Sequence, residues 1–149
     1  MKKFYFIFLS VFLFVGVINA QEQDADRQQR IAEYKAKRAA FISEKVSFAQ
    51  EQADQFWPLY EEYQDKRMLL LRTFRVEMRE FKEIESPTDK DYKKIVDSDF
   101  EMKSKEMQLM QEYYSRFKKM LTSQQIYNLM QAEDEFVKEY LNRRMDSRR

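Results

Sequence analysis

The side chains that commonly carry out catalysis or bind transition metals are scarce in this sequence. Its 149 residues include no histidine and no cysteine, so the usual general bases, thiol nucleophiles and zinc ligands are missing. Carboxylate pairs such as Glu61 and Glu62 alternate with Lys and Arg at helical spacing, which is typical of a solvated helix face. We therefore expect no catalytic residue, no enzyme activity and no cofactor.

Three methionines, Met102, Met107 and Met110, form the remaining group with coordination chemistry. Their thioethers could bind monovalent copper, or they could serve as flexible apolar contacts on an adaptable surface. Because no imidazole or thiolate accompanies them anywhere in the sequence, the sequence favours apolar contact. It predicts no metal site.

The composition predicts an all-α protein. Glu, Lys, Gln, Arg, Met and Leu favour helices, and the one glycine, Gly16, lies in an N-terminal apolar segment. The absence of glycine from the rest of the chain disfavours tight hairpins and phosphate-binding loops. Turn and capping residues place four helices, at about residues 27–45, 47–84, 89–120 and 123–144.

The N-terminus has the pattern of a secretory signal peptide. A basic start at residues 1–3 precedes an apolar run at residues 4–17, and a small residue, Ala20, ends the segment. The apolar run is shorter than the ~20 residues that a spanning helix needs. We therefore expect cleavage near Ala20, which makes residues 1–20 a signal peptide and not a membrane anchor.

The sequence after the signal peptide has the size of one domain. Residues 21–29 are polar and predict a disordered segment, residues 30–144 form the helical domain, and residues 145–149 predict a frayed basic tail. Removing the two lysines of the signal peptide from 27 basic residues leaves 25, against 26 acidic ones, a net charge of −1. This balance lacks the basic footprint of a nucleic-acid binder.

The longest helical pattern, residues 47–84, carries an apolar stripe with about one side chain per turn. Pro58 lies inside this helix and predicts a bend just before it. The following turn contains Pro87, which ends the helix, and Thr88, which can cap the next one. A short turn between two long helices predicts a long, bent, antiparallel hairpin.

Two helix starts carry residues with cap spacing. Thr122 and Gln125 fit a capping box, in which each side chain bonds the backbone amide of the other residue, and Leu121 precedes them as part of a hydrophobic staple. Ser47 and Gln50 have the same spacing at the start of the long helix. The sequence therefore predicts cap roles for these five residues.

Four long helices carry more apolar surface than one copy can enclose, and such an excess usually marks an interface. The sequence therefore predicts self-association, although the rings could also all belong to the core or to a dimer seam. Some of them could instead line an open binding face. The candidates for this client or dimer surface are Phe56, Trp57, Tyr60, Tyr63, Leu70, Phe74, Met78, Phe81, Met110, Tyr113 and Phe117.

Leu121-Thr122-x-x-Gln125 resembles the LTxxQ signature of the Spy/CpxP family of small periplasmic helical proteins. The stretch FWPLYEEY at residues 56–63 is similar to a Bacteroidetes branch of that family, whose members are often labelled sensors of an extracytoplasmic-function sigma factor. The family has two such motifs, and the first is degenerate here. Val46-Ser47-x-x-Gln50 fits it in one register, and Phe48-Ala49-Gln50-Glu51-Gln52 takes its place in another.

The resemblance implies a periplasmic four-helix protein whose hairpins form an antiparallel, cradle-like homodimer. It also implies ATP-independent binding of unfolded client proteins on the concave face and a link to the envelope stress response. Some relatives bind metals through His or Cys, so that property does not carry over to this chain. The expected function is therefore a chaperone-like protein that binds unfolded or apolar protein segments.

Two other hypotheses remain open from the sequence. One is a regulatory sensor that docks on a membrane-bound sigma or anti-sigma signalling partner. The other is a structural coiled-coil protein, which strict heptads would favour. Charged residues at Arg67, Asp99 and Glu106 interrupt the stripes, and this disfavours the structural hypothesis.

Overall fold

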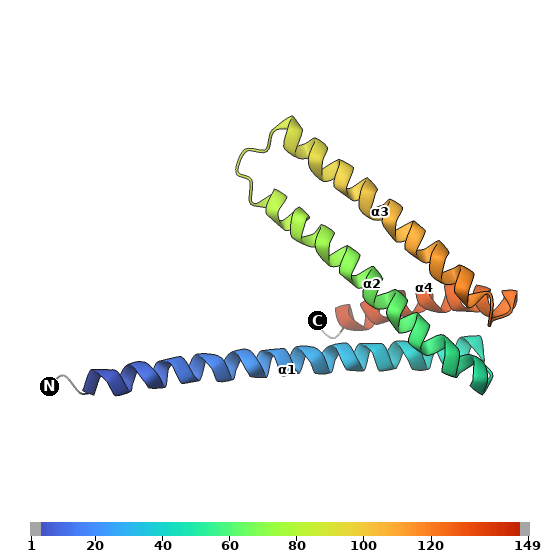
Figure 1. Cartoon of the computed structure of the whole chain (residues 1–149), viewed down its shortest axis with the longest axis horizontal. Helices are drawn as coiled ribbons and strands as arrows, with labels where there is room; N and C mark the ends of the chain where they lie inside the picture. Colours follow the sequence, from blue (N-terminus) through green and yellow to red (C-terminus); the bar gives the residue numbers. More distant parts are fainter. Residues whose placement is uncertain (1–3, 147–149) are drawn as a thin grey trace. The chain divides into compact units, whose positions relative to one another are not determined.

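The computed structural model describes the backbone of residues 4–146 and the side chains of residues 25–143, 145 and 146. Within this range the chain forms four α-helices and no strand, which confirms the all-α prediction. The helices are α1 (Phe4–Val46), α2 (Gln50–Lys82), α3 (Asp89–Phe117) and α4 (Ser123–Asp146) (Figure 1). Contacts divide the chain into two units, one from the parts before residue 46 and after residue 131, the other from residues 46–131.

The predicted signal peptide, residues 1–20, has its side chains outside the described part of the chain, and the backbone of residues 4–20 belongs to α1. Helix α1 also continues through residues 21–29, where the sequence predicts disorder. This segment contains no glycine or proline that would interrupt a helix, and the side chains of residues 25–29 are exposed. Among the residues with described side chains, no helix is long and apolar enough to cross a bilayer.

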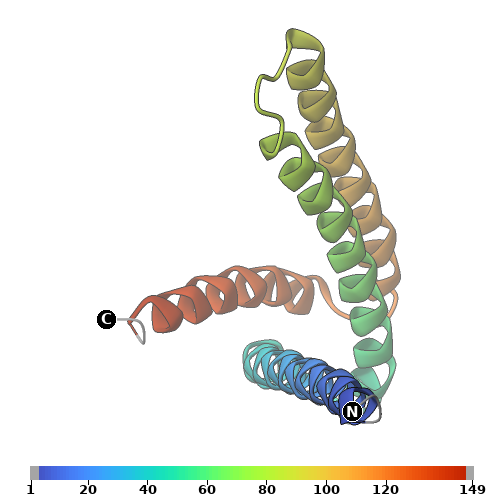
Figure 2. The ribbon, with the colours of Figure 1, turned by 90° about the vertical axis from the view of Figure 1, so that its left-hand side faces the viewer.

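The main feature of residues 46–131 is the hairpin of α2 and α3. The two helices run antiparallel and side by side in both views (Figure 1 and Figure 2), which confirms the predicted hairpin. Thr88 caps α3, because its backbone N–H donates to Asp91 Oδ2 at 2.9 Å and its hydroxyl accepts from the Asp91 N–H at 3.4 Å. Helix α2 remains one helix through Pro58.

The core of residues 46–131 is an aromatic cluster at the base of the hairpin. It consists of Phe56, Tyr60 and Tyr63 from α2 with Tyr113 and Phe117 from α3, and all five rings are buried. The ring centroids of Phe56 and Phe117 are 5.1 Å apart, and those of Tyr63 and Tyr113 are 5.3 Å apart. Such pairs add about 0.5–1.5 kcal/mol each beyond the area that they bury, so this base cluster joins the two helices.

In the other unit, α1 packs against the C-terminal half of α4. The Tyr34 ring lies 4.8 Å from Tyr140 and 5.4 Å from Phe136, and Phe41 lies 5.7 Å from Phe136. Tyr34 and Phe41 are seven residues apart and therefore share one face of α1. The aromatic residues of this face therefore join α1 to α4.

We predict that Phe117→Ala lowers the free energy of unfolding by about 3–5 kcal/mol, because it leaves a cavity in the base cluster. The matched control is Phe100→Ala on the same helix, where the ring is 68% exposed. The control is expected to change stability by no more than ~0.5 kcal/mol. Urea denaturation followed by circular dichroism measures both variants, and equal losses would contradict the location of the core.

Candidate functional site

Helix α4 begins with a capping box built by Thr122 and Gln125. The Gln125 backbone N–H donates to Thr122 Oγ1 at 3.2 Å, and the Thr122 N–H donates to Gln125 Oε1 at 3.0 Å. Leu121 before the cap and Ile126 after it are both buried, as the two ends of a hydrophobic staple would be. The structure thus places Leu121, Thr122 and Gln125 where their spacing predicts.

The sequence predicts a cap on α2 made by Ser47 and Gln50. This prediction is wrong, because the observed N-cap lies two residues after Ser47. The N-cap of α2 is Ala49 and its first residue is Gln50. Ser47 follows the last residue of α1 and has φ 56°, the left-handed conformation that commonly ends a helix. Because Ser47 terminates α1 in this way, it does not also cap α2. Ala49 has no side-chain acceptor, so the cap retains one bond, from the Ala49 N–H to Gln52 Oε1 at 3.0 Å.

The two cap glutamines, Gln52 and Gln125, form a closed pair of amide hydrogen bonds between the starts of α2 and α4. Gln52 Nε2 donates to Gln125 Oε1 at 3.1 Å, and Gln125 Nε2 donates to Gln52 Oε1 at 2.9 Å. Gln52 Nε2 also donates to the Met120 carbonyl at 2.8 Å, and Gln125 Nε2 to the Ser47 carbonyl at 3.5 Å. Each of these carbonyls lies two residues before the N-cap of the other helix.

The pairing makes the segments Phe48-Ala49-x-x-Gln52 and Leu121-Thr122-x-x-Gln125 structurally equivalent. This is the second of the two registers that the sequence allows for the degenerate first motif. Each glutamine oxygen accepts from its own N-cap, and each glutamine nitrogen binds the other motif. Because both side chains are half-buried, the network leaves little room for a residue with fewer donors or acceptors.

Glu62 of α2 connects α2 to α3 beside the base cluster. Its Oε1 accepts from Lys66 Nζ at 2.8 Å and from the Tyr113 hydroxyl at 2.7 Å, and its Oε2 lies 3.9 Å from Arg116 Nη1. The hydrogen bonds from Lys66 and then Tyr113 lower the pKa of Glu62. The same bond to Glu62 raises the pKa of Lys66. The carboxylate is therefore held in its ionised form.

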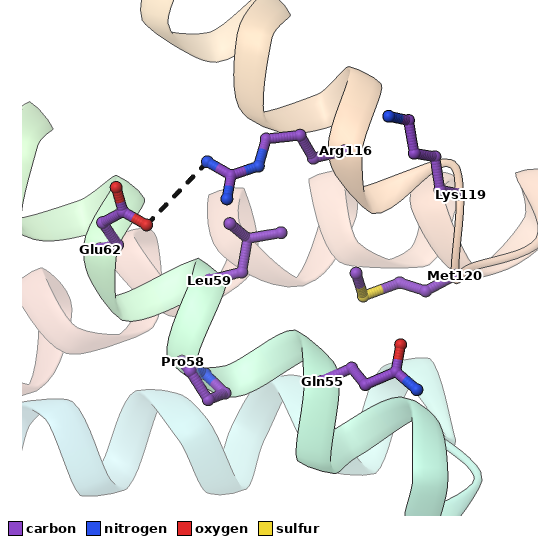
Figure 3. A pocket seen from close by; sticks show the side chains of 7 residues that line it. All are labelled: Gln55, Pro58, Leu59, Glu62, Arg116, Lys119 and Met120. Atoms are coloured by element: carbon purple, nitrogen blue, oxygen red, sulfur yellow. Dashed lines mark ion pairs between the residues drawn. The ribbon is translucent and has the colours of Figure 1, made fainter.

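A cavity of about 430 Å³ lies beside this carboxylate, between the base of α2 and the end of α3 (Figure 3). Figure 3 shows Arg116 reaching from α3 toward Glu62. The cavity lining contains one carboxylate, Glu62, which is already paired with Lys66 and Arg116. The lining therefore offers neither a metal-ligand set nor a nucleophile with a base. The lining residues are Gln55, Pro58, Leu59, Glu62, Arg116, Lys119 and Met120.

The described side chains also provide no cluster of three or more His, Cys, Asp or Glu residues that could hold a metal ion. The three methionines considered for copper do not share one face of α3. At about 100° per residue, Met102 and Met107 point roughly 140° apart around the helix. Met107 is exposed, whereas Met102 and Met110 are half-buried along the hairpin.

The candidates for a client or dimer surface fall into two groups. Five rings form the base cluster, so the structure does not present them to a ligand: Phe56, Tyr60, Tyr63, Tyr113 and Phe117. The others are half-buried along the hairpin: Trp57, Leu70, Phe74, Met78, Phe81 and Met110. The apolar stripe predicted for residues 47–84 faces α3, and α3 therefore covers its residues.

The client or dimer surface predicted from the sequence leaves out the more exposed apolar residues of the hairpin, although the sequence favours apolar contact for Met107. Five of them are about half exposed or more and lie on one side of the hairpin: Met68, Tyr92, Val96, Phe100 and Met107. Leu69 is also exposed, but it lies on the outer side of α2. Met68, Phe100 and Met107 lie beside the predicted stripes, whereas Tyr92 and Val96 lie on the stripe of the third helix. The steps of four from Tyr92 to Val96 and from Val96 to Phe100 are the signal that could have identified them.

These residues gather on one side of the hairpin, which we call the apolar face. The Glu62–Arg116 ion pair and the Glu77–Ser98 hydrogen bond mark one side of the seam between α2 and α3. Because successive residues of a helix are about 100° apart, a second set of side chains from α2 and α3 lies on the opposite side of this seam. The apolar face consists of Met68, Leu71 and Met78 of α2 with Tyr92, Val96, Phe100, Met107, Met110 and Tyr114 of α3.

We predict that Gln52→Ala and Gln125→Ala each lower the free energy of unfolding by about 1–3 kcal/mol, because each leaves the partner amide with unmade hydrogen bonds. The double variant is expected to lose less than the sum, with a coupling of about 0.5–3 kcal/mol. Urea denaturation of the four proteins measures this cycle. Gln124→Ala, exposed in the same turn, is the control, and strictly additive losses would contradict a direct pair.

The lowered pKa of Glu62 predicts a pH dependence of stability. Its stabilising contribution is present above the ordinary pKa of 4.5 and is lost as the pH falls through the lower pKa of the folded state. Glu62→Gln is therefore expected to flatten the fall in the free energy of unfolding below pH 4.5. Tyr113→Phe, which removes one of the hydrogen bonds, is expected to give an intermediate slope. Acid titration followed by circular dichroism tests both, and an unchanged Glu62→Gln slope refutes the assignment.

Comparison of the chain with protein-family models, with curated proteins and with solved structures found no match. The functional conclusion therefore has to come from the residues themselves. Within residues 46–131 these are the paired glutamine caps, which fix the base of the hairpin, and the apolar face, which the base leaves uncovered.

Proposed function

We propose that the protein is a chaperone-like binding protein that captures unfolded or apolar protein segments on the apolar face, without a nucleotide. The observation that carries the proposal is the exposure of large apolar side chains along α3, with Tyr92, Val96, Phe100 and Met107 all about half exposed or more. Apolar side chains gathered on one face, unlike those scattered singly, usually mark an interaction surface.

The types of side chain suit binding of varied sequences. Met68, Met78, Met107 and Met110 have flexible, polarizable thioethers that adapt to irregular partners. Tyr92 and Phe100 add flat rings with few rotatable bonds, so they lose little conformational entropy on binding. Such a surface favours weak and reversible capture, and a client that folds and hides its apolar segment would release itself.

The proposal includes a location and an assembly. The signal-peptide pattern of residues 1–20 supports secretion to the periplasm, and the resemblance to the Spy/CpxP family supports a role in the envelope stress response. The equivalence of the Gln52 and Gln125 segments gives the two motifs a shared structural role, which also supports that resemblance. We further propose a homodimer, because a second copy can cover apolar surface that one hairpin leaves exposed.

The test is suppression of aggregation by the secreted form, residues 21–149. Excess protein is expected to reduce the light scattering of heat-unfolded citrate synthase. The triple variant Val96→Ser, Phe100→Ser and Met107→Ser is expected to lose at least about half of this effect, because it removes apolar area from the face. Circular dichroism verifies that the variant is folded.

The matched control changes exposed apolar residues elsewhere on the hairpin. Leu69→Ser with Val76→Ser alters side chains that are 63% and 38% exposed on the outer side of α2, away from the apolar face. This control is expected to keep the suppression. No suppression by the unaltered protein, or equal losses in both variants, would remove the chaperone proposal.

A further inference from the structure

Helix α2 carries a row of four exposed cations near the tip of the hairpin. Arg72, Arg75, Arg79 and Lys82 follow one another in steps of three, four and three, which aligns them along one strip of the helix. All four side chains are exposed. At 1.5 Å per residue the row is roughly 15 Å long, so its charges lie within about two Debye lengths at physiological salt.

Most of the other cations of α2 and α3 are paired with carboxylates. Lys66 pairs with Glu62, Arg67 with Glu106, and the same holds for Lys93, Lys103, Lys105 and Arg116. None of the ion pairs among the described side chains involves the four cations of the row. Their charge is therefore available to an external anion, although the whole chain is close to neutral.

The row lies beside the tip portion of the apolar face. The ring centroids of Phe81 and Tyr92 are 5.3 Å apart, and the Ser98 hydroxyl donates to the Glu77 carboxylate. These two contacts fix the register of α2 and α3. Arg75, Arg79 and Lys82 thus lie level with the exposed side chains of Tyr92, Val96 and Phe100. In both ribbon views α2 and α3 lie side by side along this stretch (Figure 1 and Figure 2). One strip of cations and one strip of apolar side chains therefore project from the same side.

We propose that this tip surface, made of the cation row with Tyr92, Val96 and Phe100, docks on an anionic phospholipid surface. Lys and Arg next to exposed aromatic and aliphatic side chains are the combination that binds at the headgroup level of a bilayer. The cavity beside Glu62 is not lined by a residue of the row or by these three apolar residues. A strip of exposed cations roughly 15 Å long can contact several negative headgroups of an anionic bilayer at once. The inference does not depend on client capture.

Vesicle sedimentation tests the proposal. The secreted form is expected to bind vesicles of phosphatidylglycerol and phosphatidylcholine, to bind pure phosphatidylcholine at least tenfold less, and to release at high salt. Each cation near an anionic surface is worth about fivefold in binding. The variant with Arg72, Arg75, Arg79 and Lys82 all changed to Gln is therefore expected to lose about 600-fold in binding. Phe100→Ser is expected to lose severalfold, because the ring no longer inserts.

A charge-matched control changes three lysines on the side of α3 opposite the apolar face, together with Lys119 just after the end of α3. Lys90→Gln, Lys94→Gln, Lys105→Gln and Lys119→Gln together remove the same charge and are expected to retain at least half of the binding. Equal losses in the two quadruple variants would overturn the proposal, as would equal binding to neutral and anionic vesicles. Binding of an acidic apolar peptide without binding of vesicles would assign the row to a protein ligand and would also overturn it.

Discussion

The structure of residues 46–131 depends on the amide pair between Gln52 and Gln125. Two helix N-termini meet at this point, and each brings unsatisfied backbone N–H groups and the positive end of its dipole. A primary amide can accept two hydrogen bonds and donate two, so each member of a facing pair satisfies its own helix and the other motif at once. Glutamate would supply only acceptors, and two facing carboxylates would repel each other. An alanine would leave half-buried groups without partners.

The fixed base explains why the rest of the hairpin is open. The aromatic base cluster lies next to the paired caps, where residues of α4 as well as of both hairpin helices are buried. Beyond this cluster, α2 and α3 bury only the seam between them, because a helix that packs against one neighbour covers one stripe. The sides next to the seam remain half exposed. The apolar face is therefore a direct result of extending two helices past the third.

The sequence predicted the elements of the fold better than the exposure of its side chains. Pro87, Thr88 and the Thr122–Gln125 spacing have local physical causes, and each of these turns or caps occurs where expected. The start of α2 could not be found in this way, because Ser47 both resembles a cap and suits the left-handed end of α1. Gln52 accepts from Ala49 at the actual start of α2, and it makes its other hydrogen bonds with Met120 and Gln125, about seventy positions away.

Exposure was harder to predict, because residues on one helical stripe are buried at the base of the hairpin and only half-buried beyond it. Tyr60 and Phe74 lie on the same stripe of α2, yet Tyr60 is buried in the base cluster and Phe74 is only half-buried. Periodicity gives the direction of a side chain but not the point along the helix at which a third element stops covering it. Val96 lies on the stripe of α3 and is nevertheless half exposed, and Phe100, which is more exposed, lies beside that stripe.

Net charge, like periodicity, does not show local differences along the chain. A balance near zero argues against long-range attraction of a polyanion, but charges act individually within a distance of about 8–10 Å at physiological salt. The four cations of α2 stand roughly 5 Å apart along the helix axis, whereas neighbouring lysines are neutralised by carboxylates one turn away. A chain that is neutral overall can thus hold one locally cationic strip. Because the strip lies beside the apolar face, charge can orient a ligand there and apolar contact can retain it.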